Sequence, residues 1–144
     1  MKYLVMVLLL ASCFSKGDSP EAALREFVES RLEKVVSKDF ILDHTTGKMR
    51  VSVESMSDDE FQKFADLSSY KRDTFKVISK SCQEKRCYLT YSLGYKTLED
   101  KKTSWNSEVK KIAELLWIEG KWLIADVSNI KTYHEASETI EVNP

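Results

Sequence analysis

Three cysteines give this 144-residue chain its clearest chemistry. Cys82 and Cys87 flank the polar segment 83–86, which lies between two runs of strand-like residues. Opposed residues of a β-hairpin lie close enough for a disulfide, and an even pair of cysteines in an oxidising compartment favours one. A metal site and a redox pair are the alternatives, but no histidine is near and the spacing is not C-x-x-C. We predict a structural disulfide, no metal and no cofactor.

Cys13 ends a different pattern. Residues 1–12 carry one positive charge at Lys2, an apolar run over 4–10 and then two small residues. This is the arrangement of a secretory signal peptide, and the apolar run is far shorter than the roughly 20 residues that span a membrane. The segment LASC (10–13) resembles the lipobox of bacterial lipoproteins, whose cysteine receives a diacylglycerol and becomes the first residue of the mature chain.

The lipobox resemblance implies a location. It predicts a signal peptide over 1–12, a lipidated residue and tether over 13–18, and a membrane partner reached through the lipid on Cys13. In such lipoproteins an aspartate after the cysteine favours the inner membrane; here Phe14 and Ser15 follow. We therefore expect the bacterial cell envelope, on the outer membrane facing the periplasm. The alternative is an ordinary secretory signal with a cysteine near its cleavage site.

Few residues have the placement of an acid or base catalyst. The chain has two histidines, His44 and His134, and we expect both at the surface. Neighbouring residues on a strand point to opposite faces, so Tyr133 and His134 do not serve one site. No nucleophile–base arrangement is visible, so we assign no catalytic residue.

Asp126 lies in the apolar run WLIADVSNI (122–130). A carboxylate there must face solvent, accept hydrogen bonds or line a pocket. Strand alternation groups it with Trp122, Ile124 and Ser128. Together with Tyr91 and Tyr95 it is a pocket-lining candidate, and a packing or surface role is the alternative for all three.

Charge and composition exclude several classes of function. The chain has 22 basic and 23 acidic residues, whereas nucleic-acid-binding domains normally carry a basic surplus, so we expect no nucleic-acid partner. Four glycines are too few for a Gly-rich phosphate-binding loop. The length after residue 12 fits one domain, assigned to 19–135, followed by a polar tail over 136–144.

Helical patterns fill the first half of that domain. Ser19 caps a helix with Pro20 at its first position, and apolar residues then recur at steps of three and four for about five turns, through Val36. The charged residues, Arg31 among them, are assigned to its other side. Residues 39–56 predict two short helices with a break at Gly47, although MRVSVES (49–55) also alternates like a strand. A capping box over 57–60 then begins a short helix.

Strand patterns fill the second half. The runs YKRDTFKVISKSC (70–82) and RCYLTYSLGYK (86–96) alternate and are rich in aromatic and β-branched residues. A charged loop is expected over 98–106. Two further strands follow, joined at Glu119-Gly120, a pair suited to a primed hairpin turn. One strand face is expected to carry Cys87, Leu89, Tyr91, Leu93 and Tyr95, and another Ala113, Leu115 and Trp117.

This order predicts an α+β fold, with N-terminal helices packed on a curved four-stranded antiparallel sheet. The first helix, the strand CYLTYSLGYK (87–96) and the hairpin AELLWIEGKWLIADVSNI (113–130) resemble the NTF2-like superfamily. That resemblance covers roughly residues 19–133. It implies a cone in which the sheet wraps around the first helix, with a pocket at the wide end.

Two functions fit these predictions. The first is a membrane-anchored envelope lipoprotein whose domain, without enzymatic activity, binds a small molecule or another envelope protein. The second is a small-molecule enzyme of isomerase or dehydratase type, with a pocket acid or base. A deep cavity with converging ionisable groups favours the enzyme, a cavity plugged by aromatic side chains argues against it, and an exposed apolar patch on the outer sheet face favours a protein partner.

Overall fold

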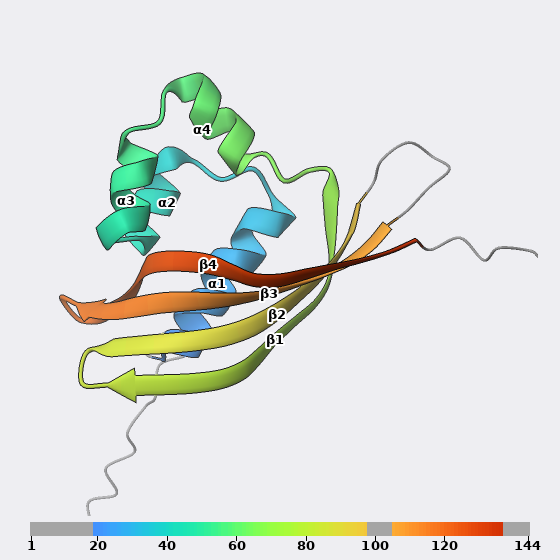
Figure 1. The fold of residues 1–144 in the computed structure, drawn as a ribbon. Coiled ribbons are helices and arrows are strands. Elements are labelled where there is room, and N and C mark those ends of the chain that lie inside the picture. Colours follow the sequence, from blue (N-terminus) through green and yellow to red (C-terminus); the bar gives the residue numbers. More distant parts are fainter. Residues whose placement is uncertain (1–18, 98–104, 137–144) are drawn as a thin grey trace, which may run out of the picture.

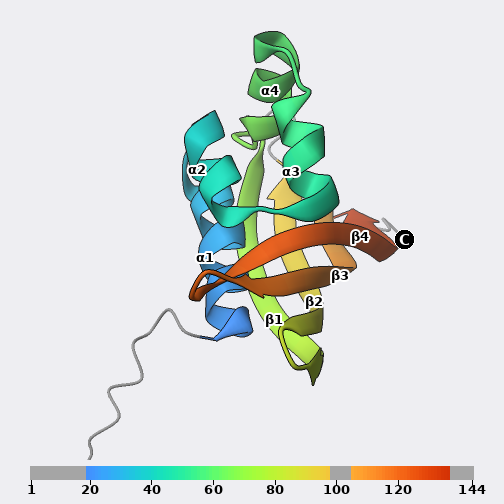
Figure 2. The same cartoon turned by 90° about the vertical axis from the view of Figure 1, so that its left-hand side faces the viewer.

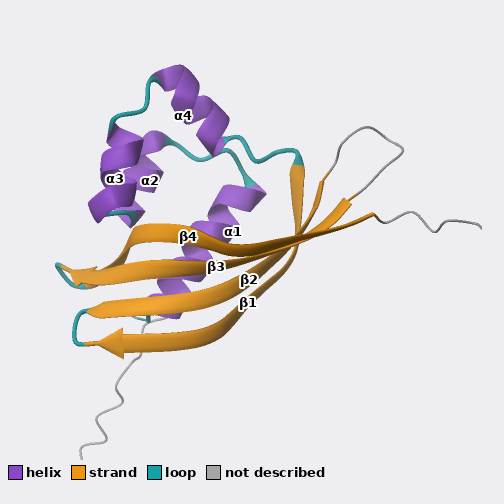
Figure 3. Ribbon diagram, viewed as in Figure 1, coloured by secondary structure: helices purple, strands orange, loops and turns teal. Residues whose placement is uncertain are grey.

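A computed structural model describes residues 19–97 and 105–136, in which four helices precede a four-stranded antiparallel sheet (Figure 1). The helices are α1 (Pro20–Glu33), α2 (Lys38–His44), α3 (Gly47–Glu54) and α4 (Asp58–Ala65). The strands are β1 (Tyr70–Gln83), β2 (Arg86–Thr97), β3 (Trp105–Ile118) and β4 (Lys121–Ala136), paired in chain order (Figure 3). The predicted α+β fold, with helices on a curved antiparallel sheet, is confirmed.

Several predicted segments lie outside the described residues. These are the signal segment 1–12, Cys13 with the tether to 18, and residues 98–104 and 137–144. Two boundaries differ from the prediction within the described part. Trp105 and Asn106 belong to β3 rather than to the loop, and Ala136, expected to begin the tail, ends β4.

Helix α1 begins as predicted and ends earlier. The Ser19 hydroxyl accepts a hydrogen bond from the Ala22 N–H at 3.1 Å. The pattern predicts about five turns through Val36, but the helix ends at Glu33 and Lys34 is already extended. Val35 and Val36 are β-branched and weakly helical, and leaving the helix buries Val36 while Val35 stays exposed.

The segment after α1 forms two helices, so the helical interpretation of 39–56 is correct and the strand alternative is wrong. Gly47 has φ +54°, and a β-carbon there would lie 3.4 Å from that of Ala125 in β4. Glycine therefore allows both the break and the close approach of α3 to β4. The Thr46 N–H donates to the Ile124 carbonyl at 2.9 Å, which ties this break to the same strand.

The sheet is strongly curved, and all four helices lie on its inner side (Figure 2). Two register shifts interrupt the β1–β2 ladder and two interrupt the β3–β4 ladder, and such bulges bend strands and increase their twist. The β3–β4 turn has positive φ at Glu119 and Gly120, as the primed hairpin turn requires. The β1–β2 turn is shorter than predicted, because Gln83 pairs with Arg86 and only residues 84–85 connect them.

The core lies between α1 and the inner sheet face. Leu24 and Phe27 of α1 are buried against it. The inner face of β2 is the predicted one: Cys87, Leu89, Tyr91 and Leu93 are buried and Tyr95 is partly buried. Ala113 and Leu115 of β3 are fully buried on the same side of the sheet.

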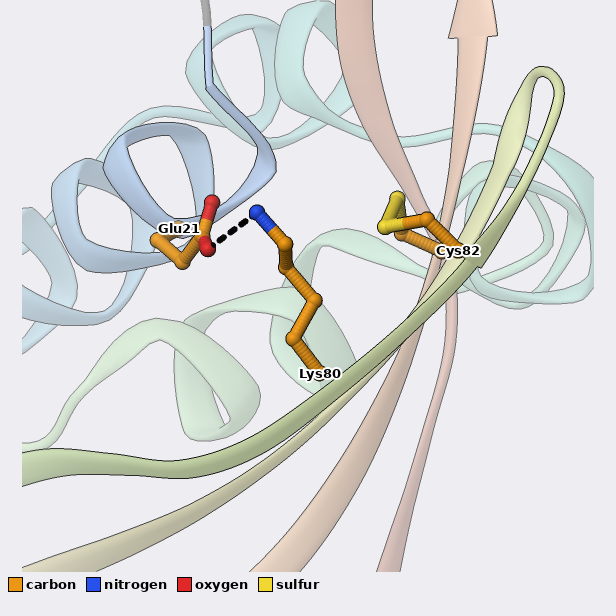
Figure 4. Close-up of a disulfide and its surroundings, with 4 residues drawn as sticks. Glu21, Lys80 and Cys82 are labelled. Carbon is orange, nitrogen blue, oxygen red and sulfur yellow. Dashed lines mark ion pairs between the residues drawn. A yellow bond between two sulfur atoms is a disulfide. The ribbon is translucent and has the colours of Figure 1, made fainter.

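Polar contacts join α1 to the edge strand β1. Glu21 and Lys80 form an ion pair at 2.6 Å, near the disulfide between Cys82 and Cys87 (Figure 4). Arg72 pairs with Glu29, which lies eight residues after Glu21 in the same helix. The two cysteines are direct cross-strand partners with Cα atoms 4.1 Å apart. The disulfide and both ion pairs therefore hold β1, which has a strand neighbour on one side only in the described part of the chain.

Candidate binding cavity

A cavity of about 410 Å³ lies between α1, α4 and the inner face of the sheet. This volume is within the range of small-molecule sites, roughly 300–1,000 Å³. Its apolar and aromatic lining comprises Phe27, Val28, Leu32, Met49, Phe64, Leu67, Tyr70, Tyr91, Leu93, Tyr95, Val109 and Val127. Its remaining lining residues are Arg31, Lys111, Asn129 and Thr132. None of the described lining residues is an aspartate or a glutamate.

Three polar groups of the sheet lie in one row across this cavity. Tyr91 of β2 pairs directly with Lys111 of β3, and Lys111 pairs with Asn129 of β4. Directly opposed side chains on one sheet face have β-carbons about 4.5–5.5 Å apart. A phenol, an ammonium and an amide therefore stand side by side on the cavity floor, surrounded by apolar rows.

Arg31 brings a second cation to the cavity from α1. Its guanidinium carbon lies 4.3 Å from the centre of the Phe64 ring and 5.5 Å from that of Phe27. Its Nη2 donates to the Phe64 carbonyl oxygen at 3.0 Å. Its Nε is buried and has no hydrogen-bond partner among the described residues. The side chain is thus held in place on one edge, while Nε keeps an unused donor.

Burial shifts the pKa values of the ionisable sheet groups. It raises the pKa of Tyr91 to about 12, although the positive charge of Arg31 acts in the opposite direction. The pKa of Lys111 is lowered, first by burial and then by the charge of Arg31. Burial also raises the pKa of Tyr95. Within the described chain, no carboxylate forms an ion pair with Arg31 or Lys111, so their charges lack a protein counter-ion there.

The structure places two of the three predicted pocket residues in this cavity. Tyr91 and Tyr95 line it, whereas Asp126 does not. A register shift at Ala125 puts Ile124 and Val127 opposite the buried Leu115 and Ala113. The predicted grouping of Asp126 with Ile124 is therefore wrong, because strict alternation stops at the bulge.

Asp126 instead lies beside α3, at the margin of the sheet. Its carboxylate accepts a hydrogen bond from the Val127 N–H at 2.9 Å and lies 3.9 Å from the exposed Lys48 ammonium. It lines a separate hollow of about 190 Å³ beneath α3. The solvated, hydrogen-bonded alternative describes its environment.

Neither histidine lines the cavity. The Nδ1–H of His44 donates a hydrogen bond to the Phe40 carbonyl oxygen at 2.7 Å, and the His44 ring packs against the Phe40 ring, with centroids 4.2 Å apart. His134 is exposed, and its Nδ1 lies 2.7 Å from the Ser107 hydroxyl on the opposed strand. These His44 contacts lie within α2, and its Nε2 lies 3.7 Å from the Glu26 carboxylate of α1. His134 forms a cross-strand pair at the far end of the sheet.

The two cavity cations were not predicted from the sequence, although each had a signal there. Arg31 was assigned to the charged side of α1, yet it follows Phe27 by four residues and Val28 by three, which places it on the apolar face. Lys111 alternates with Val109 and Ala113, two buried residues of the same strand face. For both residues, the position in the apolar pattern indicates the face on which the side chain lies better than its charge does.

The outer sheet face exposes apolar side chains, including Tyr88 and Ile112, which alternate with buried residues of their strands. The direct cross-strand neighbours of Ile112 are Thr90 and Ser128, both polar. This face is therefore mixed in polarity. Among the described residues, no helix is long and apolar enough to cross a membrane, and no three potential metal ligands converge.

Comparisons with known proteins give a likeness in fold alone. No family model matches the chain, and no curated protein matches it in sequence. Among solved structures it is similar to RPA3114, a SEC-C motif containing protein from Rhodopseudomonas palustris, with a TM-score of 0.59. The alignment covers 81% of this chain and 83% of that one at 14% identity. At that identity the likeness concerns the architecture of the chain and leaves its function to be argued from the cavity.

Proposed function

We propose that this protein is a lipid-anchored envelope protein whose NTF2-like domain binds a small molecule in the cavity beneath α1. One observation carries the binding role: a cavity of about 410 Å³ with an apolar and aromatic wall and a few polar groups at defined positions. Such a composition is typical of ligand sites, in which apolar surface provides affinity and a few polar groups orient the ligand. Packed cores, by contrast, leave few voids larger than a water molecule.

The anchor half of the proposal rests on the lipobox resemblance of residues 10–13. Acyl chains on Cys13 would hold the protein at a membrane, since each buried methylene contributes about 0.8 kcal/mol. Residues 13–18 span at most about 20 Å when extended, so the domain would stay close to the membrane surface. The anchor and the cavity together fit a protein that takes up or holds a ligand at the envelope.

The enzymatic alternative has a partial basis in the same cavity. Ionisable groups do converge there, and the aromatic side chains line the cavity without filling it. However, Tyr91, with a pKa of about 12, keeps its proton at neutral pH, and no described histidine or carboxylate lines the cavity. A general base works best with a pKa near the working pH, so we favour binding without turnover.

Two measurements test the proposal. The intact mass of protein extracted from its own envelope is expected to show loss of residues 1–12 and added lipid on Cys13. Cys13→Ser is expected to release the protein from the membrane or to stall its processing. An exported chain with an unmodified Cys13 thiol would refute the anchor.

The second measurement tests the cavity. Thr132 is exposed and lines the cavity, so Thr132→Trp is expected to close it without enlarging a core residue. Ser128→Trp on the same strand is the matched control, because Ser128 is exposed and does not line the cavity. Native mass spectrometry should detect a small molecule bound to the wild type and to Ser128→Trp but not to Thr132→Trp. Equal occupancy in the wild type and both variants would show that the small molecule does not bind in this cavity.

A further inference from the structure

The cavity beneath α1 has a net positive charge that no described neighbour neutralises. Arg31 and Lys111 both reach it, and neither forms an ion pair with a described carboxylate. Some other cations of the domain are paired: Lys80 and Arg72 form ion pairs with glutamates of α1. Buried charges in proteins are normally paired, because desolvation without a partner is costly. Two unpaired cations facing one cavity therefore indicate an anionic ligand.

The donors of the cavity also point to a compact head group. Arginine and lysine donate hydrogen bonds and accept none. Tyr91 and Asn129 flank Lys111 in the same cross-strand row and add a hydroxyl and an amide. Arg31 faces this row from α1, and its contacts with the Phe64 ring and carbonyl oxygen restrict the orientation of its guanidinium. A guanidinium held in this way suits a carboxylate or phosphate, whose oxygens match its fork of donors.

The rest of the wall requires an apolar body on the same ligand. Val28, Leu32, Leu93, Val109 and Val127 line the cavity around the polar row, together with the aromatic rings. A free inorganic anion would satisfy the cations and leave this surface in contact with water. Removing apolar surface from water is favourable by roughly 25 cal/mol per Å², so a ligand with both parts gains from both.

We propose that the cavity selects a small ligand that carries one anionic head group, a carboxylate or phosphate ester, on an apolar body, with Arg31 and Lys111 binding the head group. This inference rests on the proposed binding function and adds the chemical class of the ligand. The lowered pKa of Lys111 predicts a second measurable effect of ligand binding. An anion beside Lys111 favours its charged form, so the protein should take up protons on binding at alkaline pH.

The test uses the purified full chain carrying Cys13→Ser, so that no lipid is attached, and isothermal titration with probes of one chain length. Octanoate carries the anionic head group, octanol is neutral and octylammonium is cationic. Inorganic phosphate represents an anion without the apolar body. We expect octanoate to bind at least tenfold more tightly than each of the other three, because hydrogen bonds to charged groups contribute about 1.5–3 kcal/mol and 1.4 kcal/mol is tenfold in affinity.

Variants assign the head group to its residues. Lys111→Met and Arg31→Met should each weaken octanoate binding at least tenfold by the same conversion. Lys110→Met is the matched control, since Lys110 is the next residue on β3 and does not line the cavity; its affinity should stay within about twofold of wild type. Lys111→Met also keeps the test valid if Arg31→Met fails to fold.

The outcomes separate the two proposals. If octanol or phosphate binds as tightly as octanoate, the ligand is not selected as an anionic amphiphile, although the cavity still binds a ligand. Unchanged octanoate affinity in Lys111→Met would overturn the assigned head-group site. Failure of all four probes to bind would contradict the binding function itself. Proton uptake on octanoate binding, measured at alkaline pH in buffers of different ionisation enthalpy and lost in Lys111→Met, would support the inference independently.

Discussion

Arg31 of α1 is joined to Phe64 of α4 in two ways. Its guanidinium carbon lies 4.3 Å from the centre of the Phe64 ring, and its Nη2 donates to the Phe64 carbonyl oxygen at 3.0 Å. The two helices thus meet through a charged side chain at the cavity rather than through apolar packing alone. This contact places the guanidinium above the sheet and restricts its orientation.

The Arg31–Phe64 contact should appear as a coupling free energy. In a double-mutant cycle of Arg31→Met and Phe64→Leu, we expect the two changes in unfolding free energy to differ from additivity by about 1 kcal/mol, the size of a partly buried cation–π contact. The backbone hydrogen bond to Phe64 is lost in Arg31→Met whichever residue is at position 64, so the cycle isolates the ring. Urea denaturation measures each variant.

A remote pair provides the control for this cycle. Arg86 begins β2 at the β1–β2 turn and pairs with Glu114 instead of an aromatic ring. Arg86→Met combined with Phe64→Leu should be additive within about 0.5 kcal/mol. Additivity of the Arg31 and Phe64 changes as well would show that the ring does not stabilise the guanidinium.

Tyr91 should make the protein less stable at high pH. Its pKa is about 12 in the fold, against an ordinary value of 10.0, so between these values the unfolded chain releases the proton and the folded chain keeps it. Stability is therefore lost as pH rises through this window, by of order 2–3 kcal/mol. Tyr91→Phe removes this loss.

The measurement for Tyr91 is the difference in unfolding free energy between wild type and Tyr91→Phe, followed by urea denaturation from pH 8 upward. The difference should stay constant below about pH 9 and then shift in favour of Tyr91→Phe. A difference that does not change with pH would mean that the phenol titrates alike in the folded and unfolded chain.

The Cys82–Cys87 disulfide should contribute modestly to stability. The cysteines are five positions apart in sequence, and the chain-entropy model gives about 2 kcal/mol for so short a loop. The double variant Cys82→Ala/Cys87→Ala should lower the unfolding free energy by roughly this amount. Reduction of the wild type with a dithiol should have a similar effect, and an unchanged midpoint after verified reduction would contradict the prediction.

Asp126→Asn should change neither the stability of the protein nor its ligand binding appreciably. The Lys48 ammonium is 86% exposed and lies 3.9 Å from the carboxylate, and such exposed pairs contribute little. The asparagine side-chain oxygen can still accept the hydrogen bond from the Val127 N–H. We expect a change in unfolding free energy within about 0.5 kcal/mol and no change in octanoate affinity. A larger loss of affinity would give Asp126 the site role that its position beside α3 does not suggest.

Much of the fold follows from residues that are close in sequence. The Ser19 cap, the Ser57–Glu60 capping box and the Glu119-Gly120 turn occur where the sequence predicts them. These features depend on backbone groups within a few residues, and apolar periodicity depends on one element at a time. For the same reason the inner face of β2, and with it Tyr91 and Tyr95, could be assigned from the chain alone.

The cavity, by contrast, arises from contacts between elements far apart in sequence. Arg31 and Lys111 lie on different elements and meet only because the curved sheet brings β3 beneath α1. The bulge at Ala125, which separates Asp126 from the inner face, is likewise set by the pairing of β3 and β4. Local patterns specify which face of an element is buried; the packing of helices on the sheet determines which buried charges share a site.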